Sequence, residues 1–436
     1  MTPNLDALAN DGVLFTRAYA SSPSCVPARA AIMTGKYPHQ CGCPSYITHL
    51  PEHETLFFSL LRGAGYHTAY LGKMHLGTSR VDPGLDYADI VDSHTPRPEA
   101  PQADSYQQWL WDAGFRQATE LIDLNFGPRL SAQWKTSPRY HVDEYVGDQG
   151  VRWLKHSAPT DQPWCCTVSF PGPHMPIDCG SFPEADSYDA RSIDMPSTRF
   201  EMLADRPEHN ALAHGDPPAP WEPLTEDEIR GQRRAYYANV SLIDRKIGEI
   251  VDVLRNRGFY DNTLVVVTSD HGDYLGDFGL NGKGQNVHEV LMRVPLIVKP
   301  ARCEVRGKRE SSLVCNVDIA ATLLRSAAVS VPDDMASRDL SPYWAAELDL
   351  DDRDLVYMEA AGIRVLRDRR WKFCHYQGRD YGELYDLQSD PWETTNRWDD
   401  PEQHQRKQRF MRSMVDVLIG LSPRSASMWN VGAPPL

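Results

Sequence analysis

The sequence lacks any long hydrophobic run. No stretch of its 436 residues approaches the roughly 20 consecutive apolar residues that a membrane-spanning helix needs, and no signal-peptide pattern is visible. Its nine cysteines are an odd number and supply no disulfide framework. We therefore expect a protein with no membrane partner, located in a reducing compartment such as the cytoplasm.

The chain also has fewer positively charged than negatively charged side chains. The chain has 45 Lys and Arg against 60 Asp and Glu, which gives a net charge of −15. This balance argues against nucleic acid or an anionic membrane surface as a partner. An anionic small molecule remains open as a substrate, because a local cluster of cations can reverse the sign of the field inside a cleft.

Helical and strand patterns alternate along most of the chain. Apolar residues recur at helical spacing from Thr225 to Arg257, and Thr225 with Glu228 forms a capping-box pattern. The β-branched run at 263–269 predicts a strand covered on both faces. Shorter patterns predict helices at 2–12 and 54–63 and strands at 13–15, 67–71 and 294–298. This alternation predicts an α/β fold in which helices flank a large, mostly parallel central sheet.

The pattern changes near residue 350. Strand-like pieces at 355–359, 362–366 and 371–376 are separated by charged turns, and a helix is predicted at 402–421. We expect a large domain at 1–345 and a small carboxyl-terminal α+β domain at 346–436, built from an antiparallel sheet and one helix.

Cys25 opens an alanine-rich helical stretch, Cys25-Val26-Pro27-Ala28-Arg29. The exposed N–H groups and the dipole at a helix amino terminus favour anions, and Arg29 lies about one turn further on. Cys25 is therefore a candidate anion-facing cysteine. From the residues alone, a buried free cysteine is the commoner outcome.

Three further segments place cations or metal ligands after predicted strands or apolar runs. They are Gly72-Lys73-Met74-His75-Leu76-Gly77, Pro173-His174-Met175-Pro176 and Ser269-Asp270-His271-Gly272-Asp273. Loops at the carboxyl ends of strands are where α/β proteins bind ligands, and a carboxylate beside an imidazole suits a metal. Taken singly, each segment could equally be an ordinary turn.

Cys41 and Cys43, with His39 and His49 nearby, are an alternative candidate for binding zinc. Their spacing does not match that of the usual structural zinc sites.

These segments together resemble the type I sulfatases of the alkaline-phosphatase-like superfamily. Cys25-Val26-Pro27-Ala28-Arg29 followed by Thr34-Gly35 is similar to the family's modification signature. Gly72-Lys73-Met74-His75-Leu76-Gly77, Pro173-His174-Met175-Pro176, Asp270-His271-Gly272 and Gly282-Lys283-Gly284 follow in the family's order. The segment from Glu383 to Asn396 is similar to the family's carboxyl-terminal hairpin and is expected to be structural.

The resemblance implies a sulfuric ester hydrolase that acts on a small sulfated substrate, an aryl sulfate or a sulfated sugar. A formylglycine-generating enzyme would convert Cys25 to the nucleophile. Arg29, Lys73, His75 and Lys283 would bind the sulfate group, and His174 would contact the leaving-group oxygen. Asp270 and His271 would be ligands of a calcium ion.

The resemblance also implies an earlier strand whose Asp-Asp or Asp-Gln pair supplies two more calcium ligands. In the family, Thr2-Pro3-Asn4 lies after that pair, so we expect an incomplete metal site here. We also expect an unpaired edge or a groove beside the strand that leads to Asp270. A start codon assigned too late, a shortened chain and an inactive, degenerate member all stay open. A phosphonate monoester or phosphodiester hydrolase on the same scaffold is the alternative activity.

Overall fold

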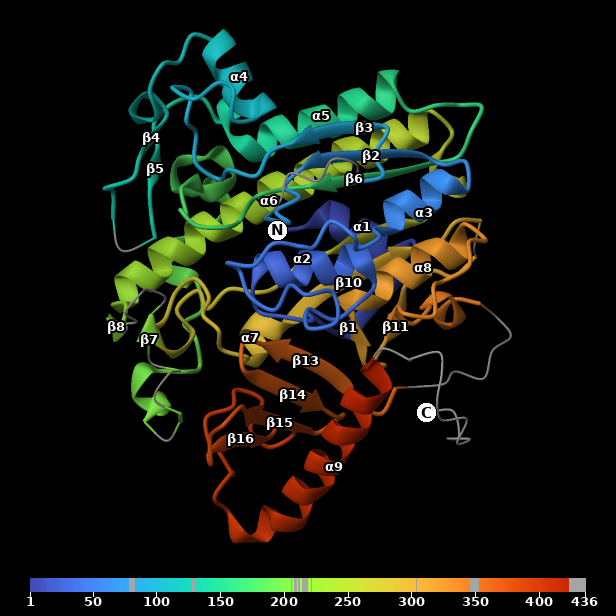
Figure 1. Cartoon of the computed structure of the whole chain (residues 1–436). Coiled ribbons are helices and arrows are strands. Elements are labelled where there is room, and N and C mark those ends of the chain that lie inside the picture. The colour runs from blue at the N-terminus through green and yellow to red at the C-terminus, as the bar shows by residue number, and fades with distance from the viewer. Residues whose placement is uncertain are drawn as a thin grey trace.

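Two separate sheets lie in the middle of the protein, with helices on both sides of them (Figure 1). The structure is a computed structural model that describes residues 1–77, 83–127, 130–204, 206–207, 210, 212–213, 219–220, 222–302, 304–345 and 353–422. Within these ranges no helix is long and apolar enough to cross a membrane.

The first sheet is entirely parallel and has the order β3–β2–β6. Its strands are β2 (His67–Gly72), β3 (Tyr87–Ile90) and β6 (Trp164–Ser169). The second sheet is mixed, with the order β11–β1–β10–β9, and β12 also pairs with β1. In it, β10 runs antiparallel to both β1 and β9, whereas β11 and β12 run parallel to β1. The strands are β1 (Val13–Tyr19), β9 (Val265–Thr268), β10 (Arg293–Lys299), β11 (Lys308–Glu310) and β12 (Val314–Cys315).

Helices cover the two sides of these sheets through separate apolar clusters. One cluster joins β2 to α2 (Cys25–Thr34), α3 (Phe57–Gly63) and α8 (Ile319–Ser326). The other joins β2 and β10 to α1 (Pro3–Asn10), α5 (Val142–His156) and α6 (Glu226–Asn256). Burial of apolar side chains on both sides stabilises this layered arrangement. The predicted α/β class is confirmed.

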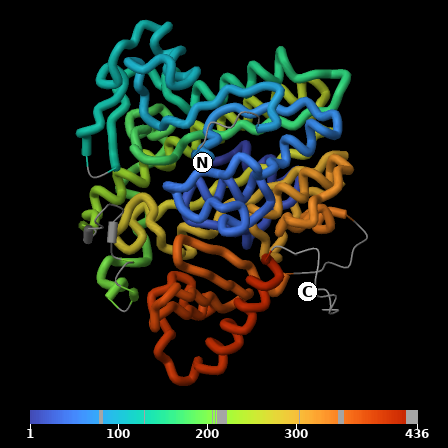
Figure 2. The backbone as a smooth tube through the Cα atoms, viewed as in Figure 1, coloured from blue at the N-terminus to red at the C-terminus, as the bar shows by residue number. Residues whose placement is uncertain are grey.

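The carboxyl-terminal part forms its own antiparallel sheet, which lies on one side of the larger part (Figure 2). Its strands run in chain order and α9 (His404–Leu421) packs against it, with Phe410 stacked on Phe373. They are β13 (Val356–Ala360), β14 (Ile363–Arg367), β15 (Trp371–Tyr376) and β16 (Gly382–Asp386). The predicted small sheet with one helix is therefore present. The expected domain boundary at 345/346 adjoins 346–352, which lie outside the described residues.

Several predicted elements have different limits. The strand predicted at 13–15 extends to Tyr19, because it pairs with β10 on one side and with β11 and β12 on the other. The helix predicted from residue 54 begins at Phe57. The capping box of Thr225 and Glu228 forms as predicted at the start of α6. Residues 80–140 show no sustained periodic pattern and are predicted to be a long, partly ordered insertion. They contain α4 (Ser105–Asp112) and the short strands β4 (Ile122–Asp123) and β5 (Gln133–Trp134). Besides several 3-10 helices, the other short elements are β7 (Leu212–Ala213), β8 (Ala219–Pro220) and α7 (Glu289–Met292).

An apolar groove separates the two sheets along β6 and β9. In the described part of the chain, β6 pairs only with β2 and β9 pairs only with β10, so one edge of each strand is unpaired. The groove has a volume of about 1270 Å³ and is lined by both strands and by the apolar face of α6. The prediction of a groove beside the strand leading to Asp270 is confirmed. The prediction that 263–269 is covered on both faces is confirmed, because Val265 and Val267 pack against one apolar cluster and Val266 packs against another. The strand residues are nevertheless only half-buried, since the free edge of β9 borders the groove.

Candidate active site

Cys25 is the first residue of α2, as the sequence predicts. Ser24 precedes the helix in an extended conformation, and its carbonyl accepts the first helical hydrogen bond from Ala28 N at 3.0 Å. The Cys25 side chain is buried and therefore lies where the unpaired N–H groups of the first turn and the helix dipole favour negative charge.

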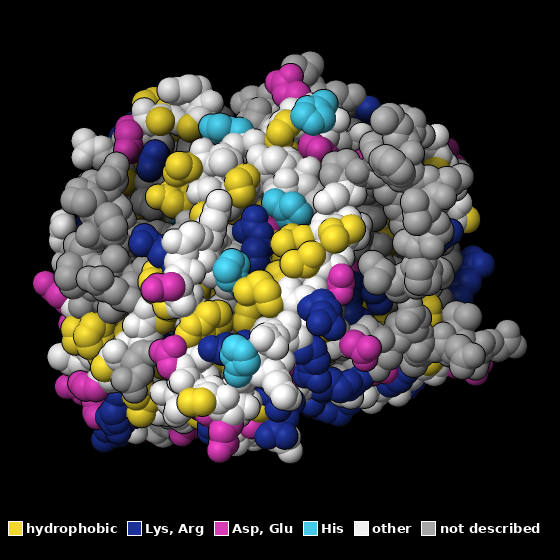
Figure 3. Space-filling view, turned by 60° about the horizontal axis from the view of Figure 1, so that its bottom comes forward, with side chains coloured by type: hydrophobic (Ala, Val, Ile, Leu, Met, Phe, Trp, Pro, Cys, Tyr) yellow, Lys and Arg dark blue, Asp and Glu magenta, His cyan; other side chains and the backbone are white. Residues whose placement is uncertain are grey.

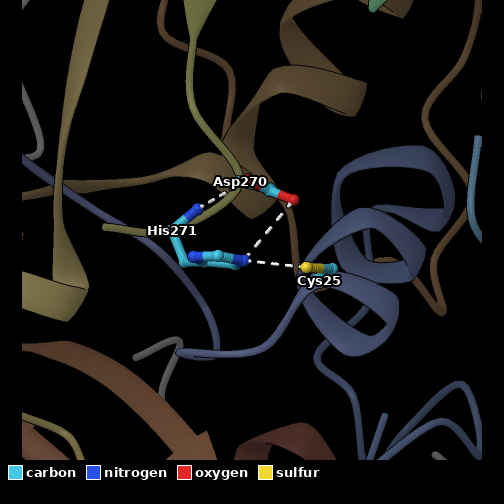
Figure 4. Close-up of side chains that lie close together, drawn as sticks. All are labelled: Cys25, Asp270 and His271. Carbon is cyan, nitrogen blue, oxygen red and sulfur yellow. Dashed lines mark hydrogen bonds and ion pairs between the residues drawn. The ribbon is translucent and has the colours of Figure 1, made fainter. Parts of the chain in front are cut away.

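Asp270 and His271 follow β9 and point toward Cys25 (Figure 4). Cys25 Sγ lies 2.9 Å from His271 Nε2, and His271 Nε2 lies 3.8 Å from Asp270 Oδ2. The other ring nitrogen, Nδ1, is 2.7 Å from Gly272 O. A carbonyl can only accept, so Nδ1 carries a proton and Nε2 is the ring nitrogen that faces the sulfur.

Arg29 forms hydrogen bonds to residues at the ends of three segments. Its Nε donates to Asp270 Oδ2 at 2.8 Å, and its Nη1 donates to Lys73 O at 2.7 Å and to Ser169 Oγ at 2.8 Å. The ion pair is buried, and the charges of Arg29 and His271 hold the pKa of the Asp270 carboxyl well below its usual range although burial alone would raise it. The structure therefore makes Arg29 the partner of Asp270, with two of its donor nitrogens committed to protein oxygens.

Lys73 follows β2 and is buried beside Cys25, with only 1% of its surface exposed. Burial lowers the pKa of the Lys73 ammonium to about 8, and the nearby charges of Arg29 and Lys283 act in the same direction.

Burial alone would raise the pKa of the Cys25 thiol. The charges of His271, Lys73 and Lys283 outweigh it and hold that pKa well below its usual value. This environment stabilises a negative charge at position 25.

His174 lies against the same sulfur but rests uncharged. Burial lowers the pKa of its imidazole, and the charges of Lys283 and Lys73 lower it further against the opposing effect of Cys25. Its Nδ1 is 2.7 Å from Met175 O, so this nitrogen carries the proton and Nε2 is an acceptor.

His75 lies further from the cysteine than the sequence suggests. Its ring meets the ring of His94 edge-on at 6.5 Å between centroids, and His94 in turn stacks on His174 at 3.9 Å. The backbone N–H groups of Met74 and His75 both donate to Asp92 Oδ1. His75 is thus separated from His174 by a second histidine ring.

Several residues at this site have no role predicted from the sequence. His94 follows β3 at the same sheet edge as Lys73, inside an insertion that shows no periodic pattern. Asn316 donates to Asp270 O at 3.2 Å, and Ser169 binds Arg29. Asp273 is half-buried near Lys283, and desolvation raises the pKa of its carboxyl to about 6. His94 and Asp273 follow strands and Ser169 ends one, and such positions predict ligand binding in α/β proteins. Nothing in the sequence marks Asn316.

A calcium ion does not fit the donors that the described residues provide. Cys25, Asp270 and His271 offer ligand atoms within 4.8 Å of one another, but only Asp270 contributes oxygen. One Asp270 oxygen is paired with Arg29 and the other accepts from His271 N. Calcium takes six to eight oxygen ligands. This outcome agrees with the expectation of an incomplete metal site.

The surface of this acidic protein is uneven in charge. On the face shown in Figure 3, lysine and arginine side chains gather into a band while acidic side chains are scattered. The cations of the candidate site show the same local reversal at a buried position, where Arg29, Lys73 and Lys283 surround Cys25 despite the net charge of −15.

Comparison with known proteins places these features in one family. The family model described as "Sulfatase" matches residues 1–329, and the model "N-sulphoglucosamine sulphohydrolase, C-terminal" matches residues 276–418. A choline-sulfatase of Rhizobium meliloti is 30% identical over 438 residues, which cover 92% of this chain and 78% of the relative. An N-acetylglucosamine-6-O-sulfatase of Bacteroides thetaiotaomicron is 26% identical over 482 residues, covering 95% of this chain and 81% of the relative.

The fold is also found among solved structures. A phosphonate monoester hydrolase from Silicibacter pomeroyi superposes with a TM-score of 0.84 at 23% identity, covering 98% of this chain and 92% of that chain. At this identity the likeness establishes the fold alone. The matching family models and the curated relatives establish more, and the chain belongs to the sulfatase family of enzymes.

Proposed function

We propose that this protein hydrolyses a sulfate monoester with a formylglycine made from Cys25 as its nucleophile. The observation that carries the proposal is the position of Cys25 at the start of α2, with its sulfur 2.9 Å from His271 Nε2 and within the field of Lys73 and Lys283. A formylglycine-generating enzyme is the partner that would carry out the conversion and supply the oxidant.

The reaction would take place in two steps at the carbon that now bears the sulfur. Water adds to the aldehyde and gives a gem-diol, and one of its hydroxyl oxygens attacks the ester sulfur atom. The bond from sulfur to the alcohol oxygen breaks, and the alcohol leaves with a proton. The second hydroxyl then loses its proton, the bond to the sulfate oxygen breaks with its electrons going to sulfate, and the aldehyde re-forms.

The histidines support the proton transfers. His271 Nε2 faces position 25 and Nδ1 donates to Gly272 O, so His271 without a proton on Nε2 would take the proton of a hydroxyl there. His174 rests neutral, so it would protonate the leaving oxygen only after it has itself gained a proton; Lys283 is the alternative donor.

Two cations support the charge that develops during attack. Lys73, which is buried, and Lys283, which is half-buried, lie beside Cys25 and would stabilise the sulfuryl oxygens. Arg29 would act by holding Asp270 and the Lys73 loop in place, through the bonds described above. No step is assigned to a calcium ion, because the described donors do not fit one.

The substrate class is a small sulfated molecule, an aryl sulfate or a sulfated sugar. The names of two relatives, a choline-sulfatase and an N-acetylglucosamine-6-O-sulfatase, support small sulfate esters as the class. A phosphonate monoester is the competing substrate, because it presents the same single negative charge on a tetrahedral centre and a phosphonate monoester hydrolase shares this fold.

Paired kinetics separate the two substrates. The full chain, expressed with a formylglycine-generating enzyme, would be assayed on an aryl sulfate and on the matching aryl phosphonate monoester. We expect a higher kcat/KM for the sulfate. A clear preference for the phosphonate would overturn the assignment of a sulfatase reaction but keep the site.

Intact-mass analysis tests the nucleophile. Conversion of Cys25 lowers the mass of its peptide by about 18 Da, whereas ordinary cysteine oxidation raises it. A peptide containing Cys166, treated in parallel, controls for that oxidation. An unmodified Cys25 in a host that modifies other sulfatases would instead support an inactive, degenerate member.

A further inference from the structure

A second group of metal-ligating side chains lies outside the candidate active site. It consists of His141, Asp178 and Cys179, whose ligand atoms all lie within 4.8 Å of one another. All three side chains are buried, with Cys179 only 1% exposed. The zinc site considered at Cys41 and Cys43 is not a comparable group, because His39 Nδ1 contacts Glu359 Oε2 at 2.8 Å and both cysteines lie in an apolar cluster.

The three separations match the edges of a metal-centred tetrahedron. Zinc bonds of about 2.0–2.2 Å to nitrogen and oxygen and about 2.3 Å to sulfur place these atoms about 3.4 Å (N to O) and about 3.6 Å (to S) apart. His141 Nε2 lies 3.3 Å from Asp178 Oδ1, and Cys179 Sγ lies 3.5 Å from Asp178 Oδ1 and 3.8 Å from His141 Nε2. The nitrogen–oxygen separation is longer than the usual hydrogen bond of about 2.7–3.2 Å.

A carboxylate lies within reach of His141 on the side away from the group. Its other ring nitrogen, Nδ1, accepts from Asp143 N at 3.3 Å and lies 3.5 Å from Asp143 Oδ2. When Nε2 binds zinc, Nδ1 carries the proton instead, and Asp143 Oδ2 is the nearby acceptor that would orient the ring. Asp143 is itself fixed, since it accepts from Gly172 N and Asn239 Nδ2, both at 2.9 Å. The rings of Trp134 and Phe182 pack edge-on against the imidazole and close off the site.

We propose that His141, Asp178 and Cys179 bind one zinc ion, with a water molecule as the fourth ligand. A thiolate, an imidazole and a carboxylate together suit zinc and do not suit calcium or magnesium.

The proposed zinc would fix the position of the loop that carries His174. His141 directly precedes α5, and Asp178 and Cys179 follow the loop at 172–177. Asp143 holds the beginning of that loop through Gly172 N. The metal would connect the end of the loop to the same helix start. This zinc site does not depend on the reaction proposed for Cys25.

Zinc content is the first test. The full chain with Cys25→Ser, in which the candidate active site has no sulfur, would be loaded with zinc, desalted and analysed for metal. We expect about one zinc per chain from these three ligands and at least about tenfold less after Cys179→Ala. Cys43→Ser, at another buried cysteine, is the matched control and should keep the zinc. Equal zinc in the Cys179→Ala and Cys43→Ser proteins would overturn the proposal.

X-ray absorption at the zinc edge is a second test and requires no change in the cluster. In the Cys25→Ser protein we expect one sulfur at about 2.3 Å and nitrogen and oxygen ligands at about 2.0–2.2 Å. A spectrum with no sulfur, or with two, would overturn the proposal. A spectrum without sulfur would mean that His141 is a protonated histidine between Asp143 and Asp178 and not a zinc ligand. A spectrum with two sulfurs would mean that zinc is bound by other cysteines.

Discussion

Two lysines, one in each part of the protein, are buried equally deeply and have opposite electrostatic surroundings. Lys73 is 1% exposed beside Cys25, and Lys372 is fully buried in β15. Among the described residues Lys73 makes no ion pair, and burial lowers the pKa of its ammonium to about 8. Lys372 contacts Glu393 and the carbonyl of Val287, and the Glu393 charge raises the Lys372 pKa although burial would lower it.

The contrast between Lys73 and Lys372 indicates which buried charges stabilise the folded protein. A buried charge costs free energy unless a partner compensates it. The Lys372–Glu393 pair compensates itself, and Glu393 also accepts from Glu289 N, which links the carboxyl-terminal sheet to α7. Lys73 and the neighbouring cations instead leave a positive field at Cys25. Such a field is useful if an anion binds there.

The largest expected effect is at the nucleophile. Cys25→Ala removes the atom that would become formylglycine and should lower kcat/KM at least about 10³-fold, because covalent catalysis is lost entirely. The melting temperature should change little, since alanine fills most of the same buried space. Turnover that survives in Cys25→Ala would show that position 25 is not the nucleophile.

Removing the uncompensated lysine should harm activity but not stability. Lys73→Met is expected to lower kcat/KM about 10²–10³-fold, because one buried cation that faces the developing charge is lost. Its melting temperature should equal or exceed that of the parent, since an unpaired buried charge is removed. Steady-state kinetics and thermal unfolding on the same sample test both expectations; a large fall in melting temperature would contradict this account of Lys73.

Removing the compensated lysine should do the reverse. Lys372→Met leaves Glu393 buried without its partner and should lower the free energy of unfolding by about 3–5 kcal/mol. The kcat of the folded fraction should stay near that of the parent, because Lys372 lies outside the candidate site. Chemical denaturation measures the loss. The double variant Lys372→Met/Glu393→Gln is the control and should recover part of it; no recovery would mean that the pair is not the cause.

The smallest effect is in the pH dependence. The folded-state pKa of Lys73, about 8, lies below the usual lysine value of about 10.4. Below pH 8 both the folded and unfolded chains carry this charge and its cost is fully present. Between the two values only the unfolded chain holds the proton, so stability rises with pH. The gain in melting temperature from Lys73→Met should therefore be largest below pH 8 and shrink above it.

Activity should fall as the pH rises, whereas stability should increase. As the pH rises through about 8, free Lys73 loses its charge and kcat/KM should fall up to about tenfold per pH unit. Lys73→Arg keeps the charge at every pH and should lack this descending limb. A limb that persists unchanged in Lys73→Arg would assign it to another group.

Local sequence signals predicted part of this site. The helix start at Cys25 and the strand ends before Lys73 and Asp270 were visible because apolar periodicity and small residues mark element boundaries. His94 was missed because its insertion has no period. The group of His141, Asp178 and Cys179 was also missed, because its members come from segments more than 30 residues apart in the chain.

The sequence by itself determined the α/β class, the small carboxyl-terminal sheet and the motifs that follow the strands. These features depend on residue spacing within single elements, which a linear chain displays directly. Only the tertiary structure decided that β9 faces a groove, that Arg29 pairs with Asp270 and that Lys73 has no ion-pair partner in the described part of the chain. These outcomes depend on which distant segments share a low-dielectric environment, because burial and neighbouring charges fix the protonation of each group.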